Sequence, residues 1–273
     1  MHQEIDDDQT DPCLTFVTPT LLAGDRSLVD VVAHEAAHSW TGNLVSCKTF
    51  ESFWLNEGWT VYLERLILRA LHGEEARMLS ATIGWKALEE SVEHFGATNP
   101  LTALQPDLTG IDPDDSFSSV PYEKGFNFLY YLETLFGFDL FTAFFKAYII
   151  AFTNKSLDTA EFKAFLQDWF MTKQTTLSKE EVQKRWAEID WHVWMKQPGL
   201  PPVGGKGKPP FTSKLAEDVM TLVDRWRKVD DRSVESAGFS KEDIASFSSV
   251  QQGDFMPLKG EFLILLTCIS AVS

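Results

Sequence analysis

The sequence predicts a mainly α-helical protein with one edge strand near its N-terminus. Apolar residues recur at spacings of three and four through several segments that are long enough for ordinary helices. Hydrophobic residues make up 44% and aromatic residues 13% of the 273 positions, which suffices for a large core without disulfide staples. One short stretch combines β-branched and aromatic residues with a proline, as edge strands do.

The N-terminal region is expected to hold an acidic tail followed by that strand. Residues 1–12 contain five acidic residues and no periodic apolar pattern, so we predict that they are disordered. Residues 13–22 (CLTFVTPTLL) have the composition of an edge strand that Pro19 interrupts.

The first helix is expected to begin at Ser27. Ser27 and Asp30 have the spacing of a capping box, with Asp in place of the usual Glu, and an apolar run follows as far as Trp40. Residues 101–120 show no periodicity and predict a long connection, of the kind that is often functional. Apolar periodicity with Gly or Pro at the boundaries predicts further helices at 56–71, 74–95, 121–136, 140–152 and 159–170.

A segment rich in proline and glycine is expected to divide the chain. Residues 13–200 form the main lobe in this interpretation, and residues 201–210 form a linker. Residues 211–273 contain helical patterns at 213–229 and 241–248 but are too few for an independent core of ordinary size. We therefore predict that they begin an incomplete helical C-terminal domain.

Charge and cysteine content argue against several classes of function. The formal net charge of −16 argues against nucleic acid or an anionic membrane surface as a partner. The most apolar stretch, residues 262–272, is shorter than the about 20 residues that a membrane-spanning helix needs. The 3 cysteines include no CxxC pair, and no apolar leader opens the chain, so a cytoplasmic protein is expected.

The motif that carries chemistry is HEAAH at residues 34–38, an HExxH pattern inside the first predicted helix. Because residues four apart share a helix face, the imidazoles of His34 and His38 can reach one metal ion. Glu35 lies beside that face, where it can act as general base on a metal-bound water. A partly buried helix with a polar stripe would give the same pattern, so these five residues alone leave both interpretations open.

Glu57 is the predicted third ligand. It follows His38 after 18 intervening residues, at the start of the next predicted helix. A helix hairpin would place its carboxylate against the two histidines and leave a fourth position open to water, as catalytic zinc requires. A structural zinc site would more often use thiolates, and neither Cys13 nor Cys47 has the spacing for one. We therefore expect one Zn²⁺ per chain.

Glu64 is a candidate for orienting a ligand. It lies seven residues after Glu57 and hence on the same helix face, where its carboxylate can accept a hydrogen bond from a ligand imidazole. A solvated ion pair with Arg65 or Arg69 is the alternative, and the sequence does not choose between the two.

Longer segments around these residues resemble the M1 family of zinc aminopeptidases, in particular its leukotriene A-4 hydrolase and aminopeptidase B branch. The resemblance implies that residues 13–200 form the helical lobe of a thermolysin-like (gluzincin) catalytic domain, as a fragment of a longer enzyme. The segments that carry it are HEAAHSWTGN (34–43), FWLNEGWTVYLER (53–65), CLTFVTPTLLAGD (13–25), SVPYEKG (119–125) and PGLPP (198–202).

The resemblance assigns a role to each of five residues. His34, His38 and Glu57 would bind zinc. Glu35 would polarise the water that attacks the scissile carbonyl. Tyr122 matches the family tyrosine whose hydroxyl stabilises the oxyanion of the tetrahedral intermediate. Without the motif, the same tyrosine would be interpreted as an amphipathic core residue at a helix start.

Three further positions bear on substrate binding. Asp114 matches a pocket aspartate that handles substrate in the hydrolase branch, although the sequence alone indicates a turn residue. Phe117 stands where that branch has a second active-site tyrosine. Residues 7–11 (DDQTD) stand where the family has its Gly-x-Met-Glu-Asn exopeptidase motif, so the glutamate that grips the free α-amine is absent.

The expected function is zinc-dependent hydrolysis of N-terminal residues from peptides, with epoxide hydrolysis as a further activity of the intact parent enzyme. The alternative is a truncated, non-catalytic zinc-binding fragment that acts as an interaction module. A lobe separated from its neighbouring domains exposes apolar surface, which also predicts self-association.

Overall fold

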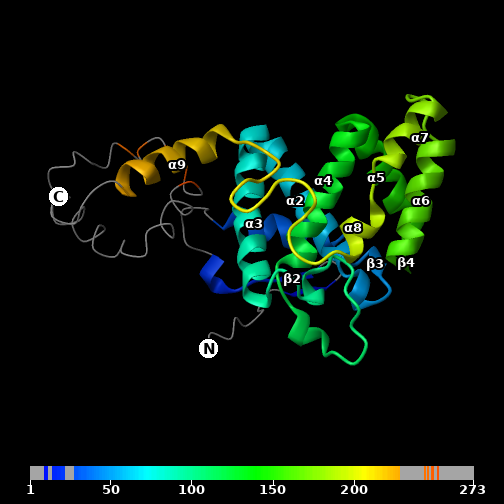
Figure 1. The fold of residues 1–273 in the computed structure, drawn as a ribbon, viewed down its shortest axis with the longest axis horizontal. Helices are drawn as coiled ribbons and strands as arrows, with labels where there is room; N and C mark the ends of the chain where they lie inside the picture. The colour runs from blue at the N-terminus through cyan, green and yellow to red at the C-terminus, as the bar shows by residue number, and fades with distance from the viewer. Residues whose placement is uncertain are drawn as a thin grey trace.

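The computed structural model describes residues 9–11, 14–21 and 28–227, together with residues 243, 245, 247, 248 and 251. Helices dominate this part of the chain, as Figure 1 shows, and the predicted fold class is confirmed. Its α-helices are α1 (Val29–His38), α2 (Trp54–His72), α3 (Glu74–Phe95), α4 (Gly125–Phe136), α5 (Phe138–Phe152), α6 (Thr159–Thr172), α7 (Lys179–Ala187), α8 (Trp191–Lys196) and α9 (Lys214–Arg227).

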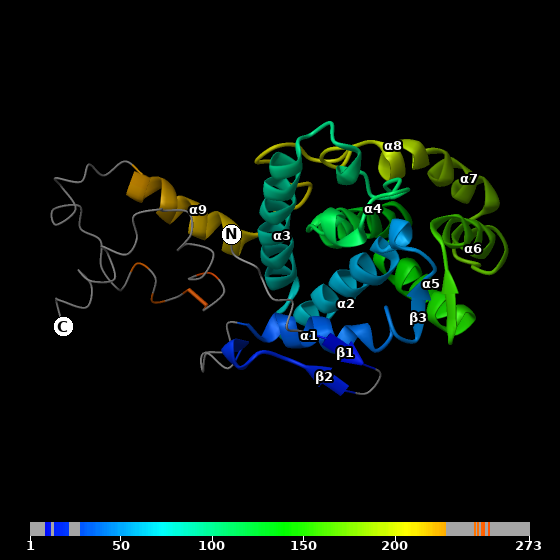
Figure 2. The same cartoon turned by 90° about the horizontal axis from the view of Figure 1, so that it is seen from below.

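The described strands form two short pairs. β1 (Gln9–Asp11) pairs antiparallel with β2 (Leu14–Phe16), and Figure 2 shows this ribbon beside α1. The prediction of disorder is wrong for β1, because pairing with β2 supplies its backbone with hydrogen bonds whatever its side chains are. Residues 1–8 lie outside the described part. The second pair, β3 (Val45–Cys47) with β4 (Lys155–Leu157), is parallel and was not predicted.

The N-terminal elements are shorter than expected. β2 ends before Pro19, which begins a 3₁₀ turn. Helix α1 starts at Val29, and its N-cap residue Leu28 makes no side-chain capping bond. The Asp30 carboxylate accepts a hydrogen bond from the Val31 N–H. The predicted partner in the capping box, Ser27, lies outside the described residues.

Most of the other helices begin and end close to the predicted residues, and α3 matches its predicted range. The exception is α4, which starts at Gly125 because Val120–Lys124 form a π-helical turn. Helices α7 and α8 were not predicted, since α7 buries Val182 alone and α8 is only six residues long. Residues 101–120 contain short 3₁₀ turns and no α-helix, in agreement with the predicted connection.

An aromatic core fixes the position of α2. Trp59 is fully buried and stacks on the rings of Phe141, Phe145 and Tyr148, with centroid distances of 5.7, 4.6 and 5.4 Å. Stacked aromatic pairs of this kind add to the free energy gained by burying their large apolar area. Because Glu57 lies on the same helix, two residues before Trp59, the core also holds the third predicted ligand in place.

The residues on either side of the proline- and glycine-rich segment 201–210 contact the rest of the structure closely. The ammonium of Lys124 donates hydrogen bonds to the carbonyls of Gln197 and Gly199 at 2.9 and 2.8 Å. Phe211 packs edge-on against Trp85. Helix α9 lies beside α3 in Figure 1 and contacts it. The domain boundaries at this segment stay predictions, and the helix expected at 241–248 lies largely outside the described residues.

The described helices include none with both the length and the apolar composition needed to cross a membrane.

Candidate metal centre

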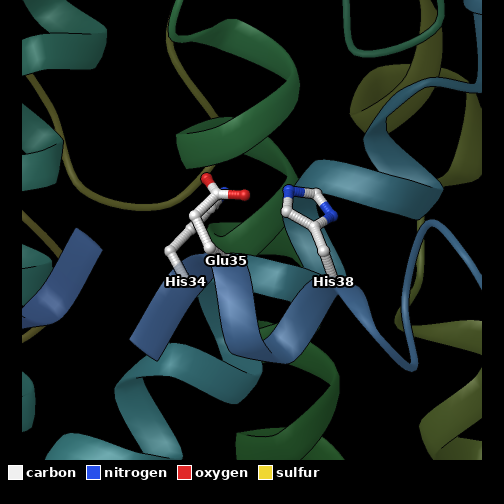
Figure 3. Close-up of side chains that lie close together, drawn as sticks. All are labelled: His34, Glu35 and His38. Carbon is white, nitrogen blue, oxygen red and sulfur yellow. The ribbon is translucent and has the colours of Figure 1, made fainter. Parts of the chain in front are cut away.

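Helix α1 brings three predicted site residues together. The side-chain donor atoms of His34, Glu35 and His38 all lie within 4.8 Å of one another. Figure 3 shows these side chains rising from one side of the helix, with the carboxylate of Glu35 close to the ring of His38. Glu35 is buried and the two imidazoles are half-buried, so the three groups share a partly desolvated site.

Helix α2 adds Glu57 to this group. Its Oε2 atom lies 3.5 Å from His34 Nε2 and 3.3 Å from His38 Nε2. Glu57 is 5% exposed, and Oε2 makes no hydrogen bond of good geometry with any described residue. A buried carboxylate oxygen without a hydrogen-bond donor is costly unless a cation satisfies it.

The opposite nitrogen of each imidazole faces an acceptor. His34 Nδ1 lies 3.0 Å from Glu64 Oε2, and His38 Nδ1 lies 2.9 Å from the carbonyl oxygen of Thr41. Carboxylate and carbonyl oxygens accept hydrogen bonds, so in each neutral imidazole Nδ1 carries the proton and Nε2 presents a lone pair. Two Nε2 lone pairs therefore converge on the orphaned oxygen of Glu57. This donor set fits a metal ion, and its ligand types suit zinc.

The carboxylates of the site favour a positive charge between Glu57 and the two histidines. Burial by itself lowers the pKa of His34, but the carboxylates of Glu57 and Glu64 outweigh burial and raise it to about 10. Burial raises the pKa of Glu57, but the two histidines outweigh that effect and hold the pKa below its ordinary value. A proton on His34 and a metal ion between the ligands are therefore competing ways to satisfy the same carboxylates.

Gly42 allows a turn to pass close to His38. Its φ is +125°, a conformation that side chains rarely adopt, and an added Cβ would lie 2.8 Å from His38 Nδ1. The Cβ atom of any other residue at this position would collide with the imidazole of His38. The glycine thus keeps the Thr41 carbonyl within reach of His38.

Tyr122 lies at the same cavity. It belongs to the π-helical turn Val120–Lys124, and its ring is stacked near His34 with a centroid distance of 6.1 Å. Together with Glu35 and Glu57 it lines the cavity above the two histidines. π-Helical turns occur frequently at functional sites, because they shift one side chain out of the ordinary helical register.

Asp114 is not brought into this cavity. It lines a neighbouring, more apolar pocket together with Leu104 and Val120. Phe53 and Phe117 line both, so the two hollows adjoin at these rings. Phe117 is 55% exposed and lies edge-on to Tyr122, with a centroid distance of 6.1 Å.

Of the two geometries considered for Glu64, the structure has the contact with His34. Arg65 and Arg69 pair with other carboxylates, those of Glu123 and Glu74. The sequence analysis missed the contact of His38 with the Thr41 carbonyl, because a backbone atom leaves no signal in the sequence. It also missed Thr60, whose hydroxyl donates to the Thr41 carbonyl at 2.8 Å. The position of Thr60, three residues after Glu57 and on the same helix face, could have indicated that its side chain lies near the site.

Comparison with known proteins identifies the family of this chain. The model of the Peptidase family M1 domain matches residues 10–187. The chain is 50% identical to leucine aminopeptidase 2 of Aspergillus niger over 240 residues, and 52% identical to leukotriene A-4 hydrolase of Xenopus laevis over 241 residues. Each alignment covers 88% of this chain and 37% of the relative.

A solved structure has the same fold over most of this chain. The structure of yeast LTA4 hydrolase in complex with bestatin matches with a TM-score of 0.82 and 41% sequence identity. The match covers 92% of this chain and 39% of the yeast chain. The chain therefore spans well under half the length of the relatives that it matches.

Proposed function

Because the chain belongs to peptidase family M1, we propose that His34, His38 and Glu57 hold one zinc ion and that the site hydrolyses N-terminal residues from peptides. The observation that carries this proposal is the convergence of two Nε2 lone pairs on Glu57 Oε2, within 3.5 Å. Both Nδ1 atoms face acceptors, so no proton of a neutral imidazole is available to satisfy that oxygen.

A bound zinc ion would act as a Lewis acid and lower the pKa of the water bound to it. Glu35 lies within 4.8 Å of the imidazole donor atoms, close enough to take a proton from that water and pass it to the leaving amine. The Tyr122 hydroxyl would donate a hydrogen bond to the oxyanion that develops on the scissile carbonyl. The cavity that Glu35 and Tyr122 share with Glu57 supports these roles.

The neighbouring pocket supports a peptide as the substrate class. Its walls are mainly apolar, and it opens beside the metal cavity at Phe53 and Phe117, so an apolar substrate side chain fits there. Asp114 lies on the wall of that pocket and is proposed to contact substrate. Epoxide hydrolysis and a cytoplasmic location stay predictions.

Replacement of Glu35 by glutamine tests the reaction. Glutamine keeps the shape of the side chain but cannot accept a proton from water, so hydrolysis of aminoacyl p-nitroanilides is expected to disappear while zinc stays bound. Glu180→Gln, at an exposed position of α7, is the matched control and is expected to keep full activity. Residual activity of the Glu35 variant that depends on zinc would contradict the mechanism. Equal hydrolysis of substrates whose α-amine is acetylated would contradict the proposed aminopeptidase activity.

An interaction module is the second candidate, and one observation favours it. Leu14 and Phe16 of β2 are 57% and 51% exposed, and Val32 of α1 is 46% exposed, on elements joined through β1. Exposed large apolar side chains on neighbouring elements favour association. Sedimentation velocity across a range of concentrations is expected to show self-association, and a monomer at every concentration would contradict it.

A further inference from the structure

A buried ion pair lies next to the candidate metal centre. Arg65 of α2 donates from Nη1 to Glu123 Oε2 at 2.8 Å and from Nη2 to Glu123 Oε1 at 2.9 Å. The two residues are 2% and 9% exposed. Arg65 also donates to the hydroxyl and the carbonyl of Ser80, and its guanidinium carbon lies 4.1 Å from the ring centre of Phe126. This fork geometry gives the pair a single well-defined arrangement.

Gly84 of α3 makes the space for the pair. A Cβ atom at this position would overlap the carboxylate of Glu123 and the guanidinium of Arg65. The glycine lies in the interior of a helix, where it is less favourable than alanine by about 1 kcal/mol. Helix α3 is therefore locally less stable at the position where it makes room for the Arg65–Glu123 pair.

The pair joins two residues that follow site residues in the chain. Arg65 comes directly after Glu64, whose carboxylate faces His34 Nδ1. Glu123 comes directly after Tyr122, whose ring lies beside the same imidazole. Successive residues of a helix point in different directions, so Glu64 and Tyr122 can face the cavity while their neighbours face each other.

The turn that carries Tyr122 is held at its other end as well. The hydroxyl of Ser119 donates to the carbonyl of Ala87 at 2.8 Å and lies 2.8 Å from the hydroxyl of Ser91, both on α3. The backbone N–H of Glu123 donates to the carbonyl of Ser119 at 2.8 Å. The turn is thus tied to α3 where it begins and to α2 through Glu123, with Tyr122 between the two attachments.

We propose that the Arg65–Glu123 pair positions Tyr122 relative to the metal ligands, so that the hydroxyl and the ligand set keep one fixed geometry. The inference rests on the proposed function, since it assigns Arg65 and Glu123 as positioning residues for that site. Buried ion pairs add little net stability compared with apolar replacements, so a geometric role accounts for a pair that stability alone does not require.

A second buried pair in the same helical lobe provides a matched control. Arg77 donates to both carboxylate oxygens of Glu133, and the hydroxyl of Tyr62 donates to the same carboxylate. Arg77 and Glu133 are 1% and 7% exposed, much as the first pair is. Neither residue lines the metal cavity. Glu133→Gln therefore removes a comparable buried charge away from the site.

The test measures where Tyr122 lies relative to a bound metal. The chain is labelled with 3-fluorotyrosine at its 5 tyrosines, Tyr122 is assigned with a Tyr122→Phe variant, and ¹⁹F spectra are recorded with Zn²⁺ and with Co²⁺. The shift that paramagnetic Co²⁺ induces depends on the distance and direction of the fluorine from the metal. We expect the same induced shift for Tyr122 in the unmutated chain and in Glu133→Gln, and a changed or broadened one in Glu123→Gln.

Kinetics provide the second measurement. Glu123→Gln is expected to lower kcat about tenfold to a hundredfold with little change in KM, because a displaced hydroxyl weakens stabilisation of the transition state more than binding of the substrate. Glu133→Gln is expected to keep both constants near those of the unmutated chain. If Glu123→Gln does not fold, Gly84→Ala takes its place, since the added methyl displaces the pair and removes neither charge.

The two possible failures are distinguishable. If the Tyr122 resonance shifts with Co²⁺ equally in all variants, the inference is overturned and the metal centre stands. If no resonance of the unmutated chain shifts with Co²⁺, the metal centre itself is overturned, and this inference with it. Equal loss of kcat in Glu123→Gln and Glu133→Gln would also overturn the inference. It would show that the loss comes from removing a buried charge and does not depend on the contact with the turn that carries Tyr122.

Discussion

Replacement of Gly58 by alanine tests the contact that sets the distance between α2 and the turn carrying Tyr122. An added Cβ would lie 2.8 Å from the Cα and 3.0 Å from the carbonyl carbon of Gly125, and 3.3 Å from the Pro121 carbonyl oxygen. All three are backbone atoms, which cannot rotate away as the end of a side chain can. We therefore expect α4 and the preceding turn to move away from α2.

The size of the effect follows from these distances. Carbon atoms in ordinary contact are about 3.5–4.0 Å apart, so the backbone of Gly125 must move by roughly 1 Å. Overpacking of this kind costs about 1–3 kcal/mol, and alanine recovers about 1 kcal/mol of helix propensity. The difference is about 0–2 kcal/mol, so the free energy of unfolding is expected to fall by about 1 kcal/mol, the middle of that range. Peptide hydrolysis is expected to fall about a hundredfold, because a misplacement of about 1 Å has that effect on catalysis.

Urea unfolding and turnover of an aminoacyl p-nitroanilide measure the two effects, and zinc affinity is measured by competition with a chelator. The affinity is expected to change little, because the proposed metal ligands lie on α1 and α2 rather than on the turn that carries Tyr122. Gly205→Ala is the control, since an added Cβ there meets no atom within 4 Å. Unchanged stability of Gly58→Ala would refute the packing argument, and unchanged turnover would refute the role given to the turn.

Three further changes have defined outcomes. Glu64→Ala is expected to weaken zinc binding about 10–100-fold in a chelator titration, and Glu64→Gln less, because glutamine still offers His34 an acceptor; equal affinity in all three chains would contradict the orienting role. Burial, aided by the charge of Glu57, raises the pKa of the Cys47 thiol to about 11. With the other two cysteines replaced by serine, its alkylation at pH 8 is therefore expected to be about 100-fold slower than that of an ordinary thiol, and to accelerate as the pH rises towards 11; a rate like that of free cysteine would show that the thiol is not buried. Lys124→Met is expected to lower the free energy of unfolding by about 2 kcal/mol, since buried carbonyls lose their donor and only part of that cost is offset by no longer burying an ammonium; a variant as stable as the unmutated chain would contradict this.

The proposed metal ligands could be predicted because their chemistry is local in sequence. His34 and His38 share a helix face, and Glu57 opens the next long helix, so spacing alone brought three donors towards one point. The boundaries of α3 were predictable for a similar reason, since Gly73 and Gly96 flank a segment in which buried residues recur at spacings of three and four. Helix periodicity is strongest where a long segment packs one face on a core.

The remaining features depend on contacts that sequence spacing does not encode. The π-helical turn around Tyr122 ends at Gly125, which passes close to Gly58, sixty-seven residues earlier in the chain. β1 forms because β2 lies beside it, although its own residues are polar and acidic. Asp114 lies in a long connection, yet it lines a neighbouring pocket together with Phe53, which lies sixty-one residues earlier in the chain. Each case is a tertiary contact that overrides a local preference.

Zinc content is the most direct test of the central claim. Metal analysis of the purified chain is compared with that of His34→Ala, after both proteins have been shown to be folded and monodisperse. About one zinc ion per unmutated chain and none in the variant is the result expected from the converging ligands. No zinc in the folded unmutated chain, or the same zinc content in His34→Ala, would contradict the claim that these residues form a metal centre.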